Sequence, residues 1–199
     1  LHWMVRRQRQ MCIRDSISVL SSIKTVDIEH TSEIATFDPA WVDSLSLSLP
    51  CYGIPVPKRT MRLPNAPRNY RNGTHRGLDF FANWGTPVRS VADGIVVRSD
   101  LYYEEVPADF RENLLKATTK VGHTPSDIFD SVLLGKSVFL DHGFDLIPGF
   151  RTISIYAHLS HIEKEIVPGA IVKRGELLGK SGNTGMREST IGSKSGSHL

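Results

Sequence analysis

The sequence predicts a mainly β protein built from antiparallel strands, with a small helical insertion. Short runs rich in β-branched residues recur from residue 86 onward, and turn-forming pairs such as Asp93-Gly94 and Pro168-Gly169 separate them. One longer segment, residues 101–135, instead spaces its apolar residues as a helix does. We therefore expect a sandwich-like β domain that is interrupted once by helices.

The composition fits a soluble protein of one domain with extensions. The chain has 199 residues, of which 40% are hydrophobic and 23% are charged, and its net charge is +3. Its basic residues form no stripe with aromatic residues, so we expect no nucleic-acid partner. No run reaches the roughly 18 apolar residues of a spanning helix, so we expect no membrane span. Cys12 and Cys51 form no disulfide framework, and we expect a monomer.

The first 60 residues carry little regular pattern. Residues 1–16 have no periodicity, caps or turn signals, and we interpret them as a non-native or disordered leader. No signal peptide is visible there. Residues 17–60 form an irregular extension in which Glu29–Asp43 has room for a short helix starting at Asp38-Pro39, and several prolines then interrupt regular structure. The folded domain is expected over residues 61–199, beginning with a loop from Met61 to Arg71.

The strands and helices of that domain follow from local patterns. The Asp93-Gly94 pair predicts a hairpin between the first two strands. Residues 109–120 place Phe110, Leu114 and Leu115 on one helix face, and Thr124 is the expected N-cap of a second helix. The expected strands cover residues 86–91, 94–98, 136–143, 151–156 and parts of 167–179.

His75 and Asp79 are the first pair with a chemical signature. In an extended segment, residues four apart point to the same face, and Gly73 and Gly77 argue against a helix here. The apolar run Leu78–Phe81 supports a short strand around the aspartate. Neutral imidazole and carboxylate are both zinc ligands. The pair alone is a weak signal, because histidine and aspartate are common on protein surfaces.

Two further histidines complete the inventory of a zinc hydrolase. His158 follows an alternating run that ends at Tyr156, and His198 is the penultimate residue of the sequence. A catalytic zinc keeps one position open for water, and a histidine beside it moves protons near neutral pH.

Other polar residues receive structural interpretations. Asp93 is expected to be a turn residue, and His142 precedes a glycine turn and is expected to be structural. His161 is expected to lie beyond the strand that ends at Tyr156, exposed to solvent. His123 falls in the loop between the two expected helices, and we interpret it as a surface residue.

Together these motifs resemble the lysostaphin-type, or LytM-like, peptidoglycan metallopeptidases, over about Pro64 to Leu199. Their order along the chain carries the resemblance. The motifs are His75–Asp79 (HRGLD), Val91–Val97 (VADGIVV), Asp141–Gly143 (DHG), Tyr156–Ser160 (YAHLS), Val172–Gly179 (VKRGELLG), Gly182–Gly185 (GNTG) and His198-Leu199.

The resemblance implies a mainly β metallopeptidase domain of the LytM type and a set of roles. His75 and Asp79 match zinc ligands, and the third ligand is expected one position beyond Leu199, outside this sequence. His158 and His198 match the catalytic histidines that orient or deprotonate the attacking water and stabilise the intermediate, in an order that the sequence leaves open. The implied activity is a zinc-dependent endopeptidase that hydrolyses peptide cross-links of bacterial peptidoglycan. Its implied location is extracellular, periplasmic or cell-wall associated.

The resemblance also implies that the C-terminal end is missing. Two protein ligands are too few for the usual three-ligand catalytic zinc site, so we expect this chain to bind zinc poorly and to be impaired. A missing final strand would leave a sheet edge open. The Gly- and Ser-rich segment Met186–Ser197 is expected to be a mobile loop at the edge of the site.

Two other functions remain as alternatives. The first is a catalytically inactive LytM-like domain that binds or regulates the cell wall. The presence of all four matching residues argues for the enzyme instead. The second is a swivelling carrier domain, because Val172–Glu176 resembles the hairpin of biotinyl or lipoyl modules. That function gives no reason for the histidines.

Overall fold

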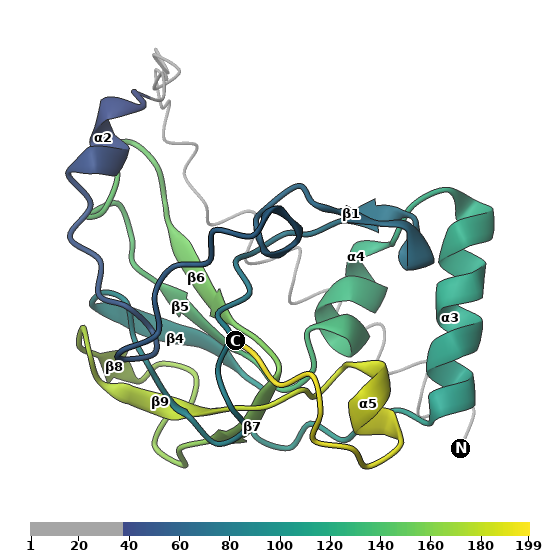
Figure 1. Cartoon of the computed structure of the whole chain (residues 1–199). Coiled ribbons are helices and arrows are strands. Elements are labelled where there is room, and N and C mark those ends of the chain that lie inside the picture. The colour runs from purple at the N-terminus through teal and green to yellow at the C-terminus, as the bar shows by residue number, and fades with distance from the viewer. Residues whose placement is uncertain (1–37) are drawn as a thin grey trace, which may run out of the picture. The chain divides into compact units, whose positions relative to one another are not determined.

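The computed structural model describes residues 38–199, which contain three antiparallel sheets (Figure 1). The expected mainly β, antiparallel fold is confirmed. The strands, in sheet order, are β1 (Pro67–Arg68) and β2 (Gly73–Thr74); β3 (Pro87–Arg89), β9 (Leu177–Ser181) and β7 (Leu159–Ile162); and β6 (Ile153–Tyr156), β5 (Val138–Asp141), β4 (Gly94–Ser99) and β8 (Ile171–Val172).

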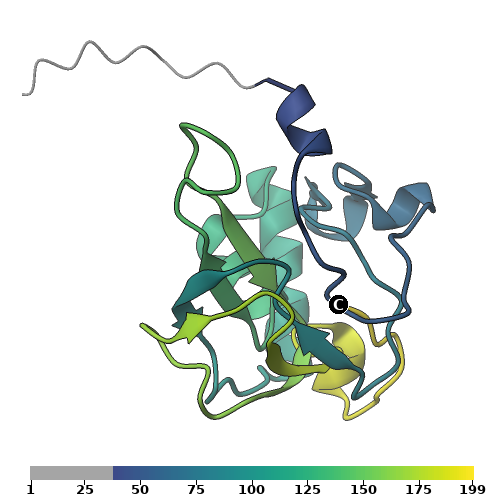
Figure 2. The same ribbon diagram turned by 90° about the vertical axis from the view of Figure 1, so that its left-hand side faces the viewer.

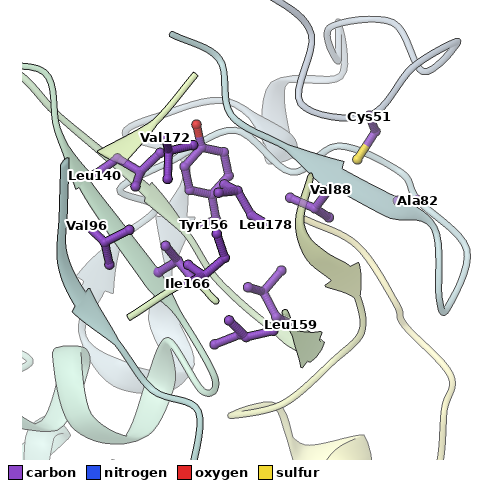
Figure 3. Close-up of a cluster of buried hydrophobic side chains, with 12 residues drawn as sticks. Cys51, Ala82, Val88, Val96, Leu140, Tyr156, Leu159, Ile166, Val172 and Leu178 are labelled. Atoms are coloured by element: carbon purple, nitrogen blue, oxygen red, sulfur yellow. The ribbon is translucent and has the colours of Figure 1, made fainter. Parts of the chain in front are cut away.

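The two larger sheets share one hydrophobic core. Figure 3 shows side chains from both sheets, among them Val88 of β3, Val96 of β4 and Leu178 of β9, gathered in a single cluster. In β5 the side chains alternate, with Val138 and Leu140 buried and Phe139 and Asp141 half-buried. Period-2 alternation of this kind is what a strand with one face on the core requires.

The expected hairpin at Asp93-Gly94 is wrong. β3 pairs with β9, whereas β4 pairs with β5 and β8, so the turn carries the chain from one sheet to the other. Val88 and Val96 have to face a common core from two sheets, and this long-range packing outweighs the local turn signal. Asp93 is a turn residue as expected, and its hydrogen bonds with Lys173 and the Arg174 backbone hold the pKa of its carboxyl below the usual value.

The helical insertion is confirmed within residues 101–135. It contains α3 (Ala108–Val121), the single turn α4 (Ser126–Ile128) and the π-helical turn η3 (Phe129–Leu133), and in Figure 2 these green-teal helices lie behind the strands. α3 buries Leu115 as expected, but Phe110 is 51% exposed. Its place on the buried face is taken by Thr118, whose hydroxyl lies 3.1 Å from the Arg71 carbonyl oxygen.

The second helix lacks the expected cap. Thr124 does not cap α4, because its hydroxyl donates to the Arg71 carbonyl oxygen at 2.7 Å. Arg71 is itself buried, and its guanidinium donates back to the Thr124 hydroxyl at 3.2 Å. The threonine therefore ties the insertion to the 3-10 turn η2 (Asn69–Arg71) instead of starting a helix.

The segment before the sheets is irregular, as expected. The short helix α2 (Ala40–Asp43) follows Asp38-Pro39, and the Asp38 carboxylate accepts the Ala40 N–H at 2.9 Å. Cys51 is fully buried among the core side chains, and burial raises the pKa of its thiol to about 11. The predictions for residues 1–37, including the leader and Cys12, fall outside the described residues. No helix within residues 38–199 combines the length and apolar character needed to cross a membrane.

The core assignment predicts unequal costs for two alanine substitutions in neighbouring strands. Leu140 is fully buried, so Leu140→Ala should lower the free energy of unfolding by about 2–5 kcal/mol. Ile155 on β6 is 49% exposed, so Ile155→Ala should cost less than about 1 kcal/mol. Urea denaturation followed by circular dichroism measures both, and equal costs would contradict the assignment.

Candidate metal centre

The structure brings His75, Asp79, His158 and His198 together in one cleft of about 1400 Å³. The His75 Nε2 lies 2.8 Å from the Asp79 Oδ1, and the His198 Nε2 lies 3.7 Å from the same oxygen. The rings of His158 and His198 are adjacent, with their centroids 4.7 Å apart. These residues come from positions up to 123 apart in the chain. His75 and His198 lie against the Asp79 carboxylate, and His158 lies against His198.

Backbone carbonyl groups determine which nitrogen of each histidine carries the proton. The Nδ1 atoms of His75, His158 and His198 lie 2.9, 2.7 and 2.7 Å from the carbonyl oxygens of Leu63, Thr184 and Gly196, respectively. A carbonyl oxygen only accepts hydrogen bonds, so each Nδ1 is the donor. In the neutral ring the other nitrogen, Nε2, then carries a free lone pair. This is the tautomer that a metal-ligating histidine needs.

The close contact between His75 and Asp79 therefore joins two acceptor atoms. A neutral imidazole Nε2 with a lone pair and a carboxylate oxygen repel each other unless a proton or a cation lies between them. This donor set suits zinc. Two ligands of a tetrahedral zinc lie about 3.3 Å apart, so the pair has to open by roughly half an ångström to admit the ion.

The histidines and Asp79 do not make a complete ligand cage. Within residues 38–199, no group of three or more histidine, cysteine, aspartate or glutamate side chains is placed to hold a metal ion. The residues present therefore fit a pair of zinc ligands, His75 and Asp79.

Arg68 orients the Asp79 carboxylate. Its Nη2 atom lies 3.3 Å from the Asp79 Oδ2 and also donates to the Met61 carbonyl oxygen at 3.0 Å. One carboxylate oxygen is thereby occupied, and Oδ1 is left facing His75. No pattern in the sequence indicated this role, because Arg68 falls in a segment expected to be a loop and lies 11 positions before its partner.

The segment that carries His75 and Asp79 is not the expected strand, because it follows β2 without regular structure and bends at Gly77. His75 follows β2 and continues its pairing with β1, since its N–H donates to the Ala66 carbonyl oxygen at 2.8 Å. Leu78 and Phe81 are exposed, and only Phe80 is buried. Phe80 exchanges two backbone hydrogen bonds, of 2.8 and 3.0 Å, with Leu199. The side chains of His75 and Asp79 nevertheless meet, as expected.

His158 lies between β6 and β7 in a left-handed backbone conformation, with a φ of 58°. Such a conformation is uncommon outside glycine and often occurs at functional sites. Burial, together with the neighbouring charge of His198, lowers the pKa of His158 to about 3. Its ring is therefore neutral near pH 7.

The helical insertion holds the loop that fixes His158. The Thr184 carbonyl oxygen accepts from the His158 Nδ1, and Gly185 follows it directly. The Glu105 Oε2 accepts the Gly185 N–H at 3.0 Å, and the Arg111 Nε donates to the Gly185 carbonyl oxygen at 3.0 Å. Both residues come from the insertion, and no local pattern in the sequence indicated this role for them.

The segment Met186–Ser197 differs from the expected mobile loop. It contains the short helix α5 (Arg187–Thr190), and Figure 1 shows it, in yellow, leading back toward the sheets. The buried Asn183 anchors it by donating from Nδ2 to the carbonyl oxygens of Ser193 and Ser195, both at 2.8 Å. A single amide side chain thus fixes the approach to His198.

The remaining histidines within residues 38–199 lie outside the cleft. His142 is buried, and its ring nitrogens lie 2.6 Å from the Asp93 carbonyl oxygen and 2.8 Å from the Ser154 hydroxyl, which agrees with a structural role. His123 is exposed, as expected. His161 is exposed and lies past the end of β6, as expected, in the next strand, β7.

Comparison with known proteins gives structural likenesses only. No family profile and no curated protein matches the chain. One similar solved structure is a protein from Pseudomonas aeruginosa described as a peptidase M23, with 28% identity over 80% of this chain and 48% of that chain, at a TM-score of 0.36. Helicobacter pylori Csd3 has 19% identity over 78% of this chain and 28% of that chain, at a TM-score of 0.39.

A third similar structure is a zinc-containing peptidase from Vibrio cholerae. It has 21% identity over 77% of this chain and 31% of that chain, at a TM-score of 0.36. The chain spans less than half the length of each of these proteins. At these TM-scores the likenesses do not assign the chain to a family.

The clamp on Gly185 predicts how its backbone amide exchanges with solvent. Glu105→Ala removes a charged acceptor, so exchange of the Gly185 N–H should speed up at least about tenfold. Glu105→Gln keeps an acceptor oxygen and should retain most of the protection. Hydrogen exchange followed by NMR measures this, with the exposed neighbour Glu104→Ala as control. Unchanged exchange in Glu105→Ala would contradict the clamp.

Proposed function

We propose that this protein is a zinc-dependent endopeptidase that hydrolyses peptide cross-links of bacterial peptidoglycan. One observation carries the proposal. Two acceptor atoms, His75 Nε2 and Asp79 Oδ1, are held 2.8 Å apart in a cleft that also contains His158 and His198. A zinc ion between His75 and Asp79 would satisfy both acceptor atoms, and His158 and His198 would lie beside the ion. The order of motifs that resembles the LytM-like peptidases supplies the substrate class.

His75 and Asp79 would hold the ion. When bound, zinc lowers the pKa of water to about 7 and polarises a carbonyl group. The Leu63 carbonyl oxygen keeps the His75 Nε2 free for this purpose, and Arg68 leaves the Asp79 Oδ1 free. These contacts orient the two ligands before the ion arrives, which reduces the cost of organising the site.

His158 and His198 would move protons. Each has its Nδ1 held by a carbonyl oxygen, so Nε2 is the atom that accepts and returns a proton. With its Nδ1 held by the Thr184 carbonyl oxygen, His158 has a free Nε2 lone pair, which would take the proton that the attacking water loses. Returning that proton to the leaving amine would complete the hydrolysis.

The cleft has room for a peptide. Its volume of about 1400 Å³ exceeds that of typical small-molecule sites, and its walls come from η2, α3 and α5 as well as the strand ends. Because peptidoglycan lies outside the cytoplasm, the proposed location is the periplasm, the cell wall or the exterior.

The pairing of Leu199 with Phe80 suggests how to complete the ligand set. Two directly opposite residues of an antiparallel pair can exchange both of their backbone hydrogen bonds. The residue after the first then lies opposite the residue before the second. The position after Leu199 would therefore lie opposite Asp79, with its side chain on the same face. The resemblance places the third ligand at that position, so the assay compares chains extended there by histidine, by alanine or not at all.

The test is release of soluble fragments from dye-labelled peptidoglycan. The histidine-extended chain should release fragments in a chelator-sensitive way, and the other two chains should be much slower. His75→Ala and His158→Ala in the extended chain should each lower the rate by at least about a hundredfold. His161→Ala, which changes an exposed histidine outside the cleft, is the matched control.

Two results would overturn the proposal. Release that persists with chelator and in His75→Ala would exclude a zinc mechanism at this site. Zinc binding by a folded, extended chain that releases nothing would favour the inactive wall-binding domain.

A further inference from the structure

The segment that leads into the metal centre is strongly basic. Residues 44–78 contain no aspartate or glutamate but six arginine or lysine residues, whereas the whole chain is nearly balanced at +3. Some of these cations also line the main cleft. The six are Lys58, Arg59, Arg62, Arg68, Arg71 and Arg76.

Two of these cations have structural partners. Arg71 is buried and donates to the Thr74 carbonyl oxygen and to Thr124. Arg68 bonds to Asp79 and to the Met61 carbonyl oxygen. Both are therefore committed to holding the fold and the metal centre, and they offer little to a ligand.

A second, smaller pocket of about 440 Å³ adjoins the main cleft. The two pockets share Arg68, Tyr70 and Asp79, so the smaller one begins directly behind the proposed zinc ligand. Its full lining is Arg59, Met61, Arg62, Pro67, Arg68, Asn69, Tyr70 and Asp79. We call it the arginine pocket.

The arginine pocket has an excess of positive charge. Its one acid, Asp79, is already engaged by Arg68 and His75. None of the ion pairs found among residues 38–199 includes Arg59 or Arg62. The Arg62 guanidinium carbon lies 4.3 Å from the centre of the Phe81 ring, a cation–π contact that restrains the group.

We propose that the arginine pocket binds a carboxylate on the peptide substrate, so the enzyme prefers acidic peptides. This inference rests on the proposed function. Planar guanidinium groups bind carboxylates through paired hydrogen bonds, which a lysine-rich surface does not provide. Because Asp79 lines both pockets, the carboxylate lies within about two residues of the cleaved bond, at roughly 3.5 Å per extended residue.

The size of the pocket favours an acidic peptide over a phosphate polymer. Proteins that bind nucleic acid through its backbone typically contact about 6–10 phosphates. The arginine pocket offers only Arg59 and Arg62 without an acidic partner among the described residues, and Tyr70 is the only aromatic side chain in its lining. Two guanidinium groups match one or two carboxylates.

The test measures binding separately from catalysis. Two fluorescent peptides with amidated ends, Ala-Glu-Ala-Ala and Ala-Gln-Ala-Ala, are titrated with the full chain in the presence of chelator, and fluorescence anisotropy gives each Kd. The Glu peptide should bind about tenfold more tightly, as expected for a charge-assisted hydrogen bond at a partly exposed site. The preference should disappear in the double variant Arg59→Gln/Arg62→Gln.

A matched double variant, Lys120→Gln/Lys164→Gln, removes the same charge at exposed residues outside both pockets and should keep the preference. Loss of the preference in this control, or equal binding of both peptides by the unmodified chain, would overturn the proposal. The proposal would also be overturned if an oligothymidylate displaced the fluorescent Glu peptide at a lower concentration than the unlabelled Glu peptide needs.

The result is independent of the zinc mechanism. Because the titration contains chelator, a clear peptide preference without any peptidoglycan release would retain the arginine pocket and reject the proposed function. Release of peptidoglycan fragments without a preference for the Glu peptide would retain the proposed function and reject the arginine pocket.

Discussion

The contact between the His75 Nε2 and the Asp79 Oδ1 is the constraint on which the account of the site depends. Backbone and side-chain contacts fix both partners independently, through the Leu63 carbonyl oxygen on one side and Arg68 on the other. Two acceptors held 2.8 Å apart are unfavourable without a positive charge between them. A proton on His75 or a metal cation supplies that charge, so the fold maintains a place for a positive charge, and the donor types match zinc.

The rest of the domain positions groups around that place. The two larger sheets provide the rigid core from which β6 and β7 present His158 in its left-handed conformation. The helical insertion clamps Gly185 and so holds the carbonyl group that orients His158. Backbone pairing with Phe80 and Gly182 brings the C-terminal residues, including His198, back to the same cleft. Each element thus contributes a contact that keeps an Nε2 lone pair available.

The sequence predicted the features that depend on local pattern. Alternation predicted β5 and β6, and helical spacing located α3. The hairpin at Asp93-Gly94 was wrong because strand partners are chosen by burial across two sheets, which no turn signal encodes. Phe110 was misplaced because the buried face of α3 is decided by its neighbours, and Thr118 packs there to bond with the Arg71 carbonyl oxygen.

For the site, too, only the features that have a local sequence pattern were predictable. The order of the motifs identified the residues that meet in the cleft, whereas Arg68, Glu105 and Arg111 act through long-range contacts and were not predicted.

Anomalous diffraction at the zinc edge, on crystals of the histidine-extended chain grown with zinc, tests the central claim directly. The account predicts a peak about 2.0–2.2 Å from both His75 Nε2 and an Asp79 oxygen. Zinc bound only elsewhere, with the His75–Asp79 contact still closed, would contradict it.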